Sequence, residues 1–163
     1  MHQFGLKNMV CNGGHGLVIN QQLICNKPLD FKKVIALIKE TQDLGYGVLV
    51  AQYNDDAVYG QDLLFIDQTG KRQEPTTYYI NPNYKFEDFE NVYKIYISVS
   101  SQEEKLRLGN SLGYLRFVEN YLMFQPDDKK ECIINMMKTL NENIDDVLVF
   151  GDDYNDIDMF NAS

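Results

Sequence analysis

The sequence of 163 residues lacks tryptophan and contains only two histidines and four prolines. Its three cysteines, Cys11, Cys25 and Cys132, lie far apart, and the sequence has no Cys-x-x-Cys pair and no Cys/His cluster. A zinc site and a disulfide-stabilised scaffold are therefore not expected. Scattered thiols are typical of a reducing cytosol, where they act as small buried apolar side chains.

Basic residues are scarce: 15 Lys and Arg stand against 24 Asp and Glu, which gives a net charge of −9. No cluster of Lys and Arg is present that would bind nucleic acid or an anionic membrane. No apolar run approaches the roughly 20 residues that span a bilayer, and the start lacks the charged head and apolar middle of a signal peptide. The sequence therefore predicts a cytoplasmic protein without nucleic-acid or membrane partners.

The composition is that of an ordinary globular protein, with 44% hydrophobic and 24% charged residues. The length allows one domain, or one and a fraction. Short apolar runs predict a strand over residues 8–11 and a hairpin over 17–19 and 22–25. A helix capped by Asp30 follows, ending near Gly45 and Gly47, with an apolar stripe of Val34, Leu37, Ile38 and Thr41.

The middle of the chain has several strand patterns, over residues 48–51, 63–66, 93–99, 115–118 and 121–124. Residues 74–91 are predicted to be irregular or briefly helical, and a helix is predicted from Ser101 to about Leu112. Residues 109–113 match the Gly-x-Ser-x-Gly pattern of a nucleophile elbow. That chemistry needs a preceding strand and a later histidine, so we interpret this segment as a helix end.

The C-terminal part combines a predicted helix with a predicted strand. The helix turns five apolar side chains inward: Cys132, Ile133, Met136, Met137 and Leu140. The apolar run over residues 147–150 predicts a strand that is buried on both faces. It ends at Gly151-Asp152-Asp153-Tyr154-Asn155-Asp156, where oxygen ligands at a sheet edge suit Mg²⁺. The alternative is a solvated acidic turn in which Asn155 or Asp156 caps the next helix.

Two lysines, Lys129 and Lys130, stand in the first turn of the predicted helix, where the macrodipole favours acidic residues. One of them can meet an anion. In the alternative, both are solvated and balance Asp127 and Asp128.

Residues 124–160 resemble the C-terminal part of the haloacid dehalogenase (HAD) superfamily, specifically its Cof-type, sugar-phosphatase-like group. Lys130 corresponds to the lysine motif of that family, and Gly151–Asp156 to its acidic motif Gly-Asp-x-x-Asn-Asp. Val10-Cys11-Asn12-Gly13-Gly14 resembles the family's strand ending in Asn-Gly-Ala, with Gly14 in place of the alanine. Residues 29–123 resemble the inserted α/β cap.

The resemblance implies an α/β fold of three segments. Residues 1–28 and 126–163 would be pieces of an incomplete Rossmann-like core, and residues 29–125 a cap domain with an antiparallel sheet and helices.

The resemblance also implies roles for individual residues. Asp152 would bind Mg²⁺, and Asp156 would be a second ligand or a support for the first. Asn155 would contact the substrate phosphate, and Lys130 would offset negative charge during phosphoryl transfer. Asn12 and Gly13 would line the cleft beneath the cap, or form a plain turn at the end of a strand.

The family's nucleophile motif, Asp-x-Asp-x-Thr, is missing from this sequence. Its phosphate-binding Ser/Thr motif would fall before Met1, and its last strand and helix after Ser163. The sequence is therefore interpreted as a fragment of a Mg²⁺-dependent phosphatase for a small phosphorylated metabolite, such as a sugar phosphate, that is inactive alone. The alternative is a non-catalytic binding or oligomerising module. Unpaired core strands favour homo-oligomers or disorder.

Overall fold

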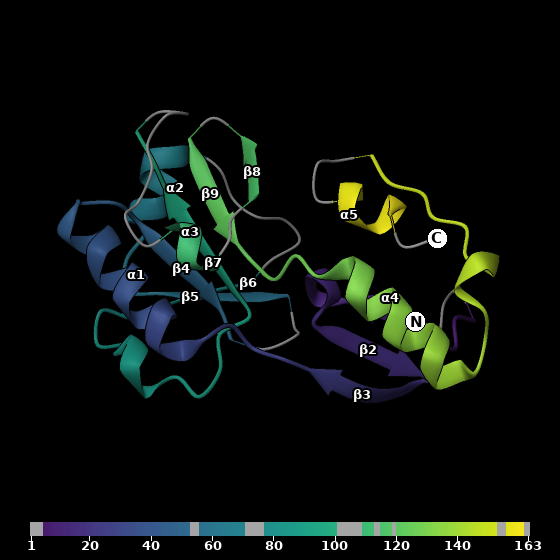
Figure 1. Ribbon diagram of the computed structural model, residues 1–163. Helices are drawn as coiled ribbons and strands as arrows, with labels where there is room; N and C mark the ends of the chain where they lie inside the picture. The colour runs from purple at the N-terminus through teal and green to yellow at the C-terminus, as the bar shows by residue number, and fades with distance from the viewer. Residues whose placement is uncertain are drawn as a thin grey trace. The chain divides into compact units, whose positions relative to one another are not determined.

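The computed structural model describes residues 5–52, 56–70, 77–100, 109–112, 115–118, 120–152 and 156–161. The chain divides into two compact units (Figure 1). The first unit comprises residues 1–27 and 126–163, and the second comprises residues 28–125. Both contain strands and helices, which confirms the mixed α/β class.

The first unit contains a three-stranded antiparallel sheet and a helix. The strands β1 (Met9–Cys11), β2 (Gly16–Ile19) and β3 (Gln22–Asn26) are neighbours in this order. Asn20 and Gln21, between β2 and β3, both have positive φ angles, of 49° and 66°, as a tight hairpin requires. The predicted strand and hairpin are thus confirmed.

The helix α4 (Lys129–Leu140) follows where a helix was predicted, and it packs against this sheet. Cys132 of α4 is buried against Leu17 and Ile19 of β2, and Met136 and Leu140 pack around this cluster. The cysteine therefore serves as a small apolar side chain in the core of the first unit.

The predicted strand over residues 147–150 is wrong. The segment forms no ladder with any other described residue, and Leu148 and Phe150 are 79% and 81% exposed. An apolar run becomes a doubly buried strand only where neighbouring strands supply hydrogen-bond partners on both sides. The described residues of the first unit place no strand there.

The second unit is built on a six-stranded sheet. Its strands lie in the order β6 (Thr77–Ile80), β5 (Ala57–Gly60), β4 (Val48–Ala51), β7 (Lys94–Ser98), β9 (Tyr121–Phe124) and β8 (Leu115–Val118). All neighbours are antiparallel except β5 and β6, which are parallel. The strand predictions over residues 48–51, 93–99, 115–118 and 121–124 are confirmed.

The helix α1 (Phe31–Asp43) packs on one face of this sheet. The Asp30 side chain accepts a hydrogen bond of 3.2 Å from the Lys33 amide, so it caps the helix as predicted. The stripe of Val34, Leu37, Ile38 and Thr41 is buried as predicted. Three of these side chains join a core that includes Val48 and Val50 of β4 and Ile95 and Ile97 of β7.

The predicted strand over residues 63–66 is wrong, because this segment begins the helix α2 (Leu64–Thr69). Asp62 accepts a hydrogen bond of 2.9 Å from the Leu64 amide, and Gly70 ends the helix with φ +66°. Phe65 packs with Leu49 on the sheet face opposite α1. A run of four apolar residues fits a strand and a helical turn equally well, and the tertiary contact decides.

Residues 74–91 are only partly irregular. Thr77–Ile80 forms the edge strand β6, which the prediction missed together with its partner β5. The expected brief helical turn is present as η3 (Phe86–Asp88). Both strands have only four residues, and periodicity is a weak signal over such lengths.

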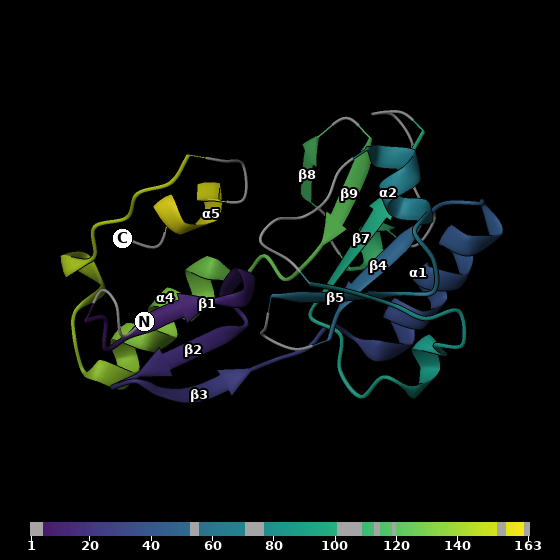
Figure 2. The same ribbon diagram turned by 180° about the vertical axis from the view of Figure 1, so that it is seen from behind.

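Four further short elements complete the described chain. They are η2 (Asn12–Gly14), α3 (Gly109–Leu112), η4 (Ile144–Asp146) and α5 (Ile157–Phe160). Figure 2 shows α5 and the strands of the first unit from the opposite side. The first eight residues of the helix predicted from Ser101 lie outside the described residues. Within the described ranges, no helix is long and apolar enough to cross a membrane.

Candidate functional site

The glycine-containing turn after β1 lies against the start of α4. Gly13 has a φ of +60° and Gly14 a φ of +100°, conformations that side chains rarely adopt. A methyl group at Gly13 would overlap the Pro126 carbonyl, and one at Gly14 would overlap the backbone of Asp128. The Asp128 amide donates a hydrogen bond of 2.7 Å to the Gly13 carbonyl. Both glycines therefore allow this turn to fix the position at which α4 begins.

An ion pair connects the start of α4 with the acidic motif. The Lys129 ammonium donates a short hydrogen bond to Oδ1 of Asp156, and the two side chains are only 22% and 12% exposed. The second oxygen of Asp156 accepts a hydrogen bond of 3.2 Å from the Asp152 amide. Asp156 thus holds both the lysine and the backbone of Asp152 in place.

Gly151 permits this arrangement through its missing side chain. A Cβ atom at Gly151 would lie 2.7 Å from Oδ2 of Asp156, which is closer than real side chains approach. The acidic motif therefore needs glycine at this position so that the Asp156 carboxylate can fold back onto the chain.

The Lys129–Asp156 pair and the glycine turn line a cavity of about 260 Å³ within the first unit. Its polar walls are Lys129, Asp156 and the two glycines of the turn, and its other walls are Val10, Cys11, Ile133 and Met159. The structure therefore brings together Gly13 and Asp156, which the sequence had selected, on the wall of one cavity.

The lysine that lines this cavity is Lys129, one of the two lysines at the helix start, whereas the family resemblance predicted Lys130. Lys130 is half-buried and does not line the cavity, and it has no hydrogen-bond or ion-pair partner among the described residues. Neighbouring helical residues point about 100° apart, so only one of the two can face Asp156. The lysine pair at the helix start was the available signal, but the sequence does not fix the rotation of the helix.

Two other predicted site residues lie differently. The side-chain nitrogen of Asn12 donates a hydrogen bond of 3.0 Å to the side-chain oxygen of Asn26, and Asn12 does not line the cavity. Its φ of 49° places it in the left-handed region, which asparagine tolerates. Asn155 lies outside the described residues.

Acidic groups surround Lys129. Burial raises the pKa of the Asp127 carboxyl, the Lys129 ammonium lowers it, and the carboxylates of Asp158, Asp156 and Asp128 raise it again. The net result is a raised pKa of the Asp127 carboxyl, with burial as the largest cause. Burial also raises the pKa of the Cys11 thiol, with Cys25 adding to the effect, and this keeps Cys11 protonated beside the cavity.

The hydrogen bonds of Asp152 and Asp156 indicate which of the two carboxylates could bind Mg²⁺ directly. Both oxygens of Asp156 already accept hydrogen bonds, whereas Asp152 is exposed and, within the described part of the chain, forms a hydrogen bond only through its backbone amide. Mg²⁺ is usually held by one or two carboxylates together with several waters. The Asp152 carboxylate therefore suits direct binding to Mg²⁺, and Asp156 suits the role of orienting Asp152. The described residues contain no group of three His, Cys, Asp or Glu that could hold a metal ion.

The two units and this site define a mixed α/β protein with a lysine–aspartate pair beside a glycine turn. The chain belongs to the haloacid dehalogenase-like hydrolase family, whose sequence profile matches residues 1–163. No curated protein sequence matches it significantly.

Solved structures with the same fold include a hypothetical protein from Geobacillus kaustophilus, with a TM-score of 0.75 and 21% identity over 97% of this chain and 62% of the other. A haloacid dehalogenase-like hydrolase from Bacillus subtilis has a TM-score of 0.69 and 18% identity over 99% and 69%. A sugar phosphatase of HAD subclass IIB has a TM-score of 0.67 and 15% identity over 97% and 62%. The chain thus spans 62% of the first and third of these structures.

Proposed function

We propose that the first unit carries the Mg²⁺- and phosphate-binding part of a phosphomonoester hydrolase of the HAD type. The observation that supports this most is the Lys129–Asp156 pair on the wall of a cavity, with Asp152 held by the same aspartate. A cation on the cavity wall, together with an exposed second carboxylate in the same acidic motif, suits phosphoryl transfer, because that reaction depends on positioning and charge neutralisation.

Each residue of the site has a distinct proposed role. Asp152 would hold Mg²⁺, and Asp156 would orient both Asp152 and Lys129. Lys129 would neutralise charge on the phosphoryl oxygens, the role first assigned to Lys130. Bound Mg²⁺ would supply further neutralisation of the same oxygens.

The glycine turn and the motif's asparagine would complete the phosphate contact. Gly13 lines the same cavity as Lys129 and Asp156, and we assign its backbone to the wall that faces the phosphate. Asn155 is the remaining residue of the acidic motif that carries an amide, and we assign it to the phosphate. Asn12 would support the turn through its hydrogen bond with Asn26.

The substrate that we propose is a small phosphorylated metabolite such as a sugar phosphate. The similarity to the fold of a sugar phosphatase supports this class. The cavity of about 260 Å³ is slightly below the usual size of small-molecule pockets, about 300–1,000 Å³. It would therefore hold the phosphate end of the substrate.

The chain of residues 1–163 is proposed to be inactive by itself. It contains no Asp-x-Asp-x-Thr sequence, so the site would bind metal and phosphate without a nucleophile for the phosphoryl group. The same observation favours the second candidate function, a non-catalytic binding module. Metal binding without turnover is expected in both cases. Competition between phosphate esters and inorganic phosphate for the Mg²⁺-loaded site would favour the first candidate function, a site of the phosphatase type.

Metal binding can be tested with Mn²⁺ as a paramagnetic substitute for Mg²⁺. We expect Mn²⁺ to broaden the NMR signals of Gly151, Asp152 and Lys129 first, and excess Mg²⁺ to reverse the broadening. Asp152→Asn should abolish this effect, whereas Asp146→Asn, at an exposed position outside the cavity, should retain it. Equal broadening in both variants would refute the assignment.

Turnover is tested separately with a generic phosphomonoester and Mg²⁺. We expect no release of phosphate above the background of buffer and metal. Turnover that Asp152→Ala abolishes would show that the chain is active despite the missing motif. It would overturn the proposed inactivity and leave the proposed metal site intact.

A further inference from the structure

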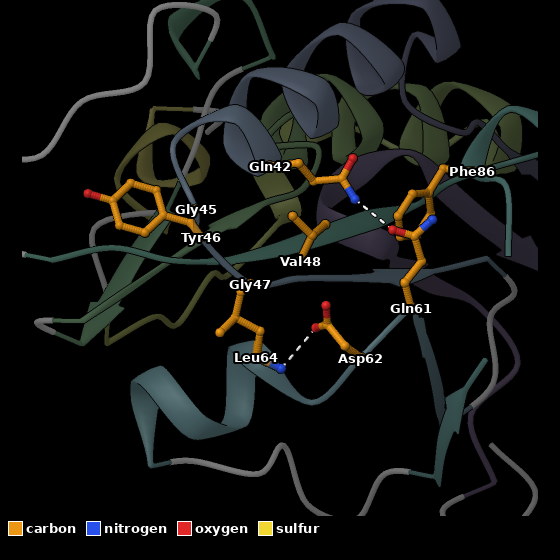
Figure 3. Close-up of a pocket in the computed structure, with 9 residues that line it drawn as sticks. All are labelled: Gln42, Gly45, Tyr46, Gly47, Val48, Gln61, Asp62, Leu64 and Phe86. Carbon is orange, nitrogen blue, oxygen red and sulfur yellow. Dashed lines mark hydrogen bonds between the residues drawn. The ribbon is translucent and has the colours of Figure 1, made fainter. Parts of the chain in front are cut away.

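The second unit contains a pocket of about 180 Å³ that is built wholly from its own residues (Figure 3). The pocket lies where the end of α1, the start of β4 and the connection from β5 to α2 come together. It is large enough for several water molecules or for one small organic molecule. No role in the proposed hydrolase site involves these residues.

The pocket lies at one particular end of the sheet. The strands β4 and β9 are both antiparallel to β7, so they run in the same direction. Val48 begins β4 at the pocket, whereas Gln125 follows the carboxyl end of β9, where the chain leaves this unit. The pocket is therefore at the end of the sheet opposite to the exit of the chain.

Hydrogen bonds fix which atoms the pocket offers to a ligand. The Gln61 amide nitrogen donates a hydrogen bond of 2.6 Å to the Tyr84 carbonyl, which can only accept. Gln61 must therefore turn its oxygen toward Gln42, and the Gln42 nitrogen donates to it at 2.7 Å. The Gln42 oxygen then remains as an acceptor, and Figure 3 shows it turned away from Gln61.

Asp62 offers a second acceptor. One of its carboxylate oxygens accepts a hydrogen bond of 2.9 Å from the Leu64 amide, and Figure 3 shows the other oxygen directed away from that amide. Neither this oxygen nor the Gln42 oxygen has a hydrogen-bond partner among the described residues.

Three consecutive backbone donors at the end of α1 are already used. The Gly45 amide donates to the backbone carbonyl of Gln42 at 2.9 Å, and the Tyr46 amide donates to the backbone carbonyl of Thr41 at 3.1 Å. The Gly47 amide donates to the Gln68 side chain at 2.9 Å. Among the described residues that line the pocket there is no Lys, Arg or His, so the pocket combines two free acceptors with the single negative charge of Asp62.

We propose that this pocket binds a small primary amine in its protonated form. The ammonium group would donate to the Asp62 carboxylate and the Gln42 oxygen, and the short carbon chain would lie against Val48 and Phe86. Phosphates and carboxylates are disfavoured because Asp62 repels them and no basic side chain among the described lining residues attracts them. The net charge of −9 adds to the preference for a cation. This proposal goes beyond the hydrolase site and does not depend on it.

Propylammonium chloride is a suitable probe, with 1-propanol as the neutral control and propanoate as the anionic control. A ligand of four heavy atoms is expected to bind with a Kd of about a millimolar. In two-dimensional NMR of the full chain, propylammonium should shift the side-chain amides of Gln42 and Gln61 and the backbone amide of Leu64 in a saturable manner. The two controls should not shift them.

The variant Asp62→Asn keeps an oxygen for the Leu64 amide and removes the charge. It should weaken propylammonium binding about tenfold or more, because a hydrogen bond between charged groups is lost. Gln42→Leu should weaken binding by a smaller factor, and it serves as the test if Asp62→Asn does not fold. Asp67→Asn, an exposed residue of α2 outside the pocket, should bind like the unchanged chain.

Three results would overturn the proposal. The first is the absence of saturable shifts at these amides with propylammonium. The second is equal binding of propylammonium and 1-propanol, which would show that the charge has no role. The third is an equal loss of affinity in Asp62→Asn and Asp67→Asn, which would indicate general attraction of a cation to an acidic protein.

Discussion

Replacing Asp156 by alanine tests how much of the first unit depends on one carboxylate. The substitution removes the partner of the Lys129 ammonium and the acceptor of the Asp152 amide. Lys129 would then keep a positive charge on a side chain that is only 22% exposed. We expect the first unit to lose stability without losing the strands of its sheet.

The magnitude follows from the burial of the pair. Breaking a fully buried ion pair costs about 3–5 kcal/mol, and an exposed pair contributes about 0–1 kcal/mol. Side chains that are 22% and 12% exposed lie nearer the buried limit, so we expect about 2–3 kcal/mol for the lost pair. The lost hydrogen bond to the Asp152 amide adds about 1 kcal/mol. Asp156→Asn keeps an acceptor for that amide and should cost about 2 kcal/mol.

The assay is a urea titration followed by two-dimensional NMR, in which signals from residues 5–27 and 126–152 report on the first unit and signals from residues 28–100 on the second. The matched control is Glu87→Gln, which removes the exposed pair between Lys39 and Glu87, with side chains 62% and 52% exposed. That variant should leave both transitions unchanged. A cost below about 1 kcal/mol for Asp156→Ala would refute the reasoning, since it would place the pair among exposed ones. An equal loss in the second unit would refute its local character.

Three further substitutions test single features. Gly151→Ala should lower the urea midpoint of the first unit and weaken the Mn²⁺ broadening near Asp152, because its methyl group would displace the Asp156 carboxylate; an unchanged midpoint with full broadening would contradict this. Burial raises the pKa of Tyr96 to about 12, with the hydroxyls of Tyr121 and Tyr78 adding to it, whereas the unfolded value is about 10. The unfolded chain therefore loses this proton first, and about 2–3 kcal/mol of stability should disappear as pH rises from about 10 to about 12. Urea titrations across this range should show that difference between the unchanged chain and Tyr96→Phe, and parallel curves would disprove it. Burial lowers the pKa of Lys94, so the folded chain binds the ammonium proton of Lys94 less tightly than the unfolded chain does. Burying the charged ammonium therefore costs folding stability, and this cost disappears only as pH rises through the lowered pKa. Lys94→Met should therefore raise the urea midpoint of the second unit at pH 7, and a lower midpoint would contradict the direction.

Local patterns determined the elements whose signals lie close together in the sequence. Asp30 caps α1, and the apolar spacing of Val34, Leu37 and Ile38 sets the face that is buried. The hairpin of β2 and β3 and the strand β7 likewise follow from turn residues and alternation. Such elements are predictable because a few neighbouring residues fix both the backbone conformation and the buried face.

Tertiary contacts decided the elements that are short and apolar. Leu64–Thr69 is a helix because Phe65 packs with Leu49, and Thr77–Ile80 is a strand because β5 lies beside it. The run over residues 147–150 has the strongest strand pattern in the C-terminal part, yet it forms no ladder with the described residues. A strand depends on partners elsewhere in the chain, which a local pattern cannot supply.

The sequence by itself supplied the motifs that predict a common site, namely the acidic motif, the lysines at the start of α4 and the glycine turn after β1. The structure alone decided that Lys129 is the lysine that pairs with Asp156, because the rotation of α4 depends on how Cys132 packs against β2. It also decided that the Asp156 carboxylate accepts a hydrogen bond from the Asp152 amide, since this contact requires the chain to turn back after Gly151. Residue types are encoded locally, whereas the distances that make them a site depend on the packing of elements far apart in the sequence.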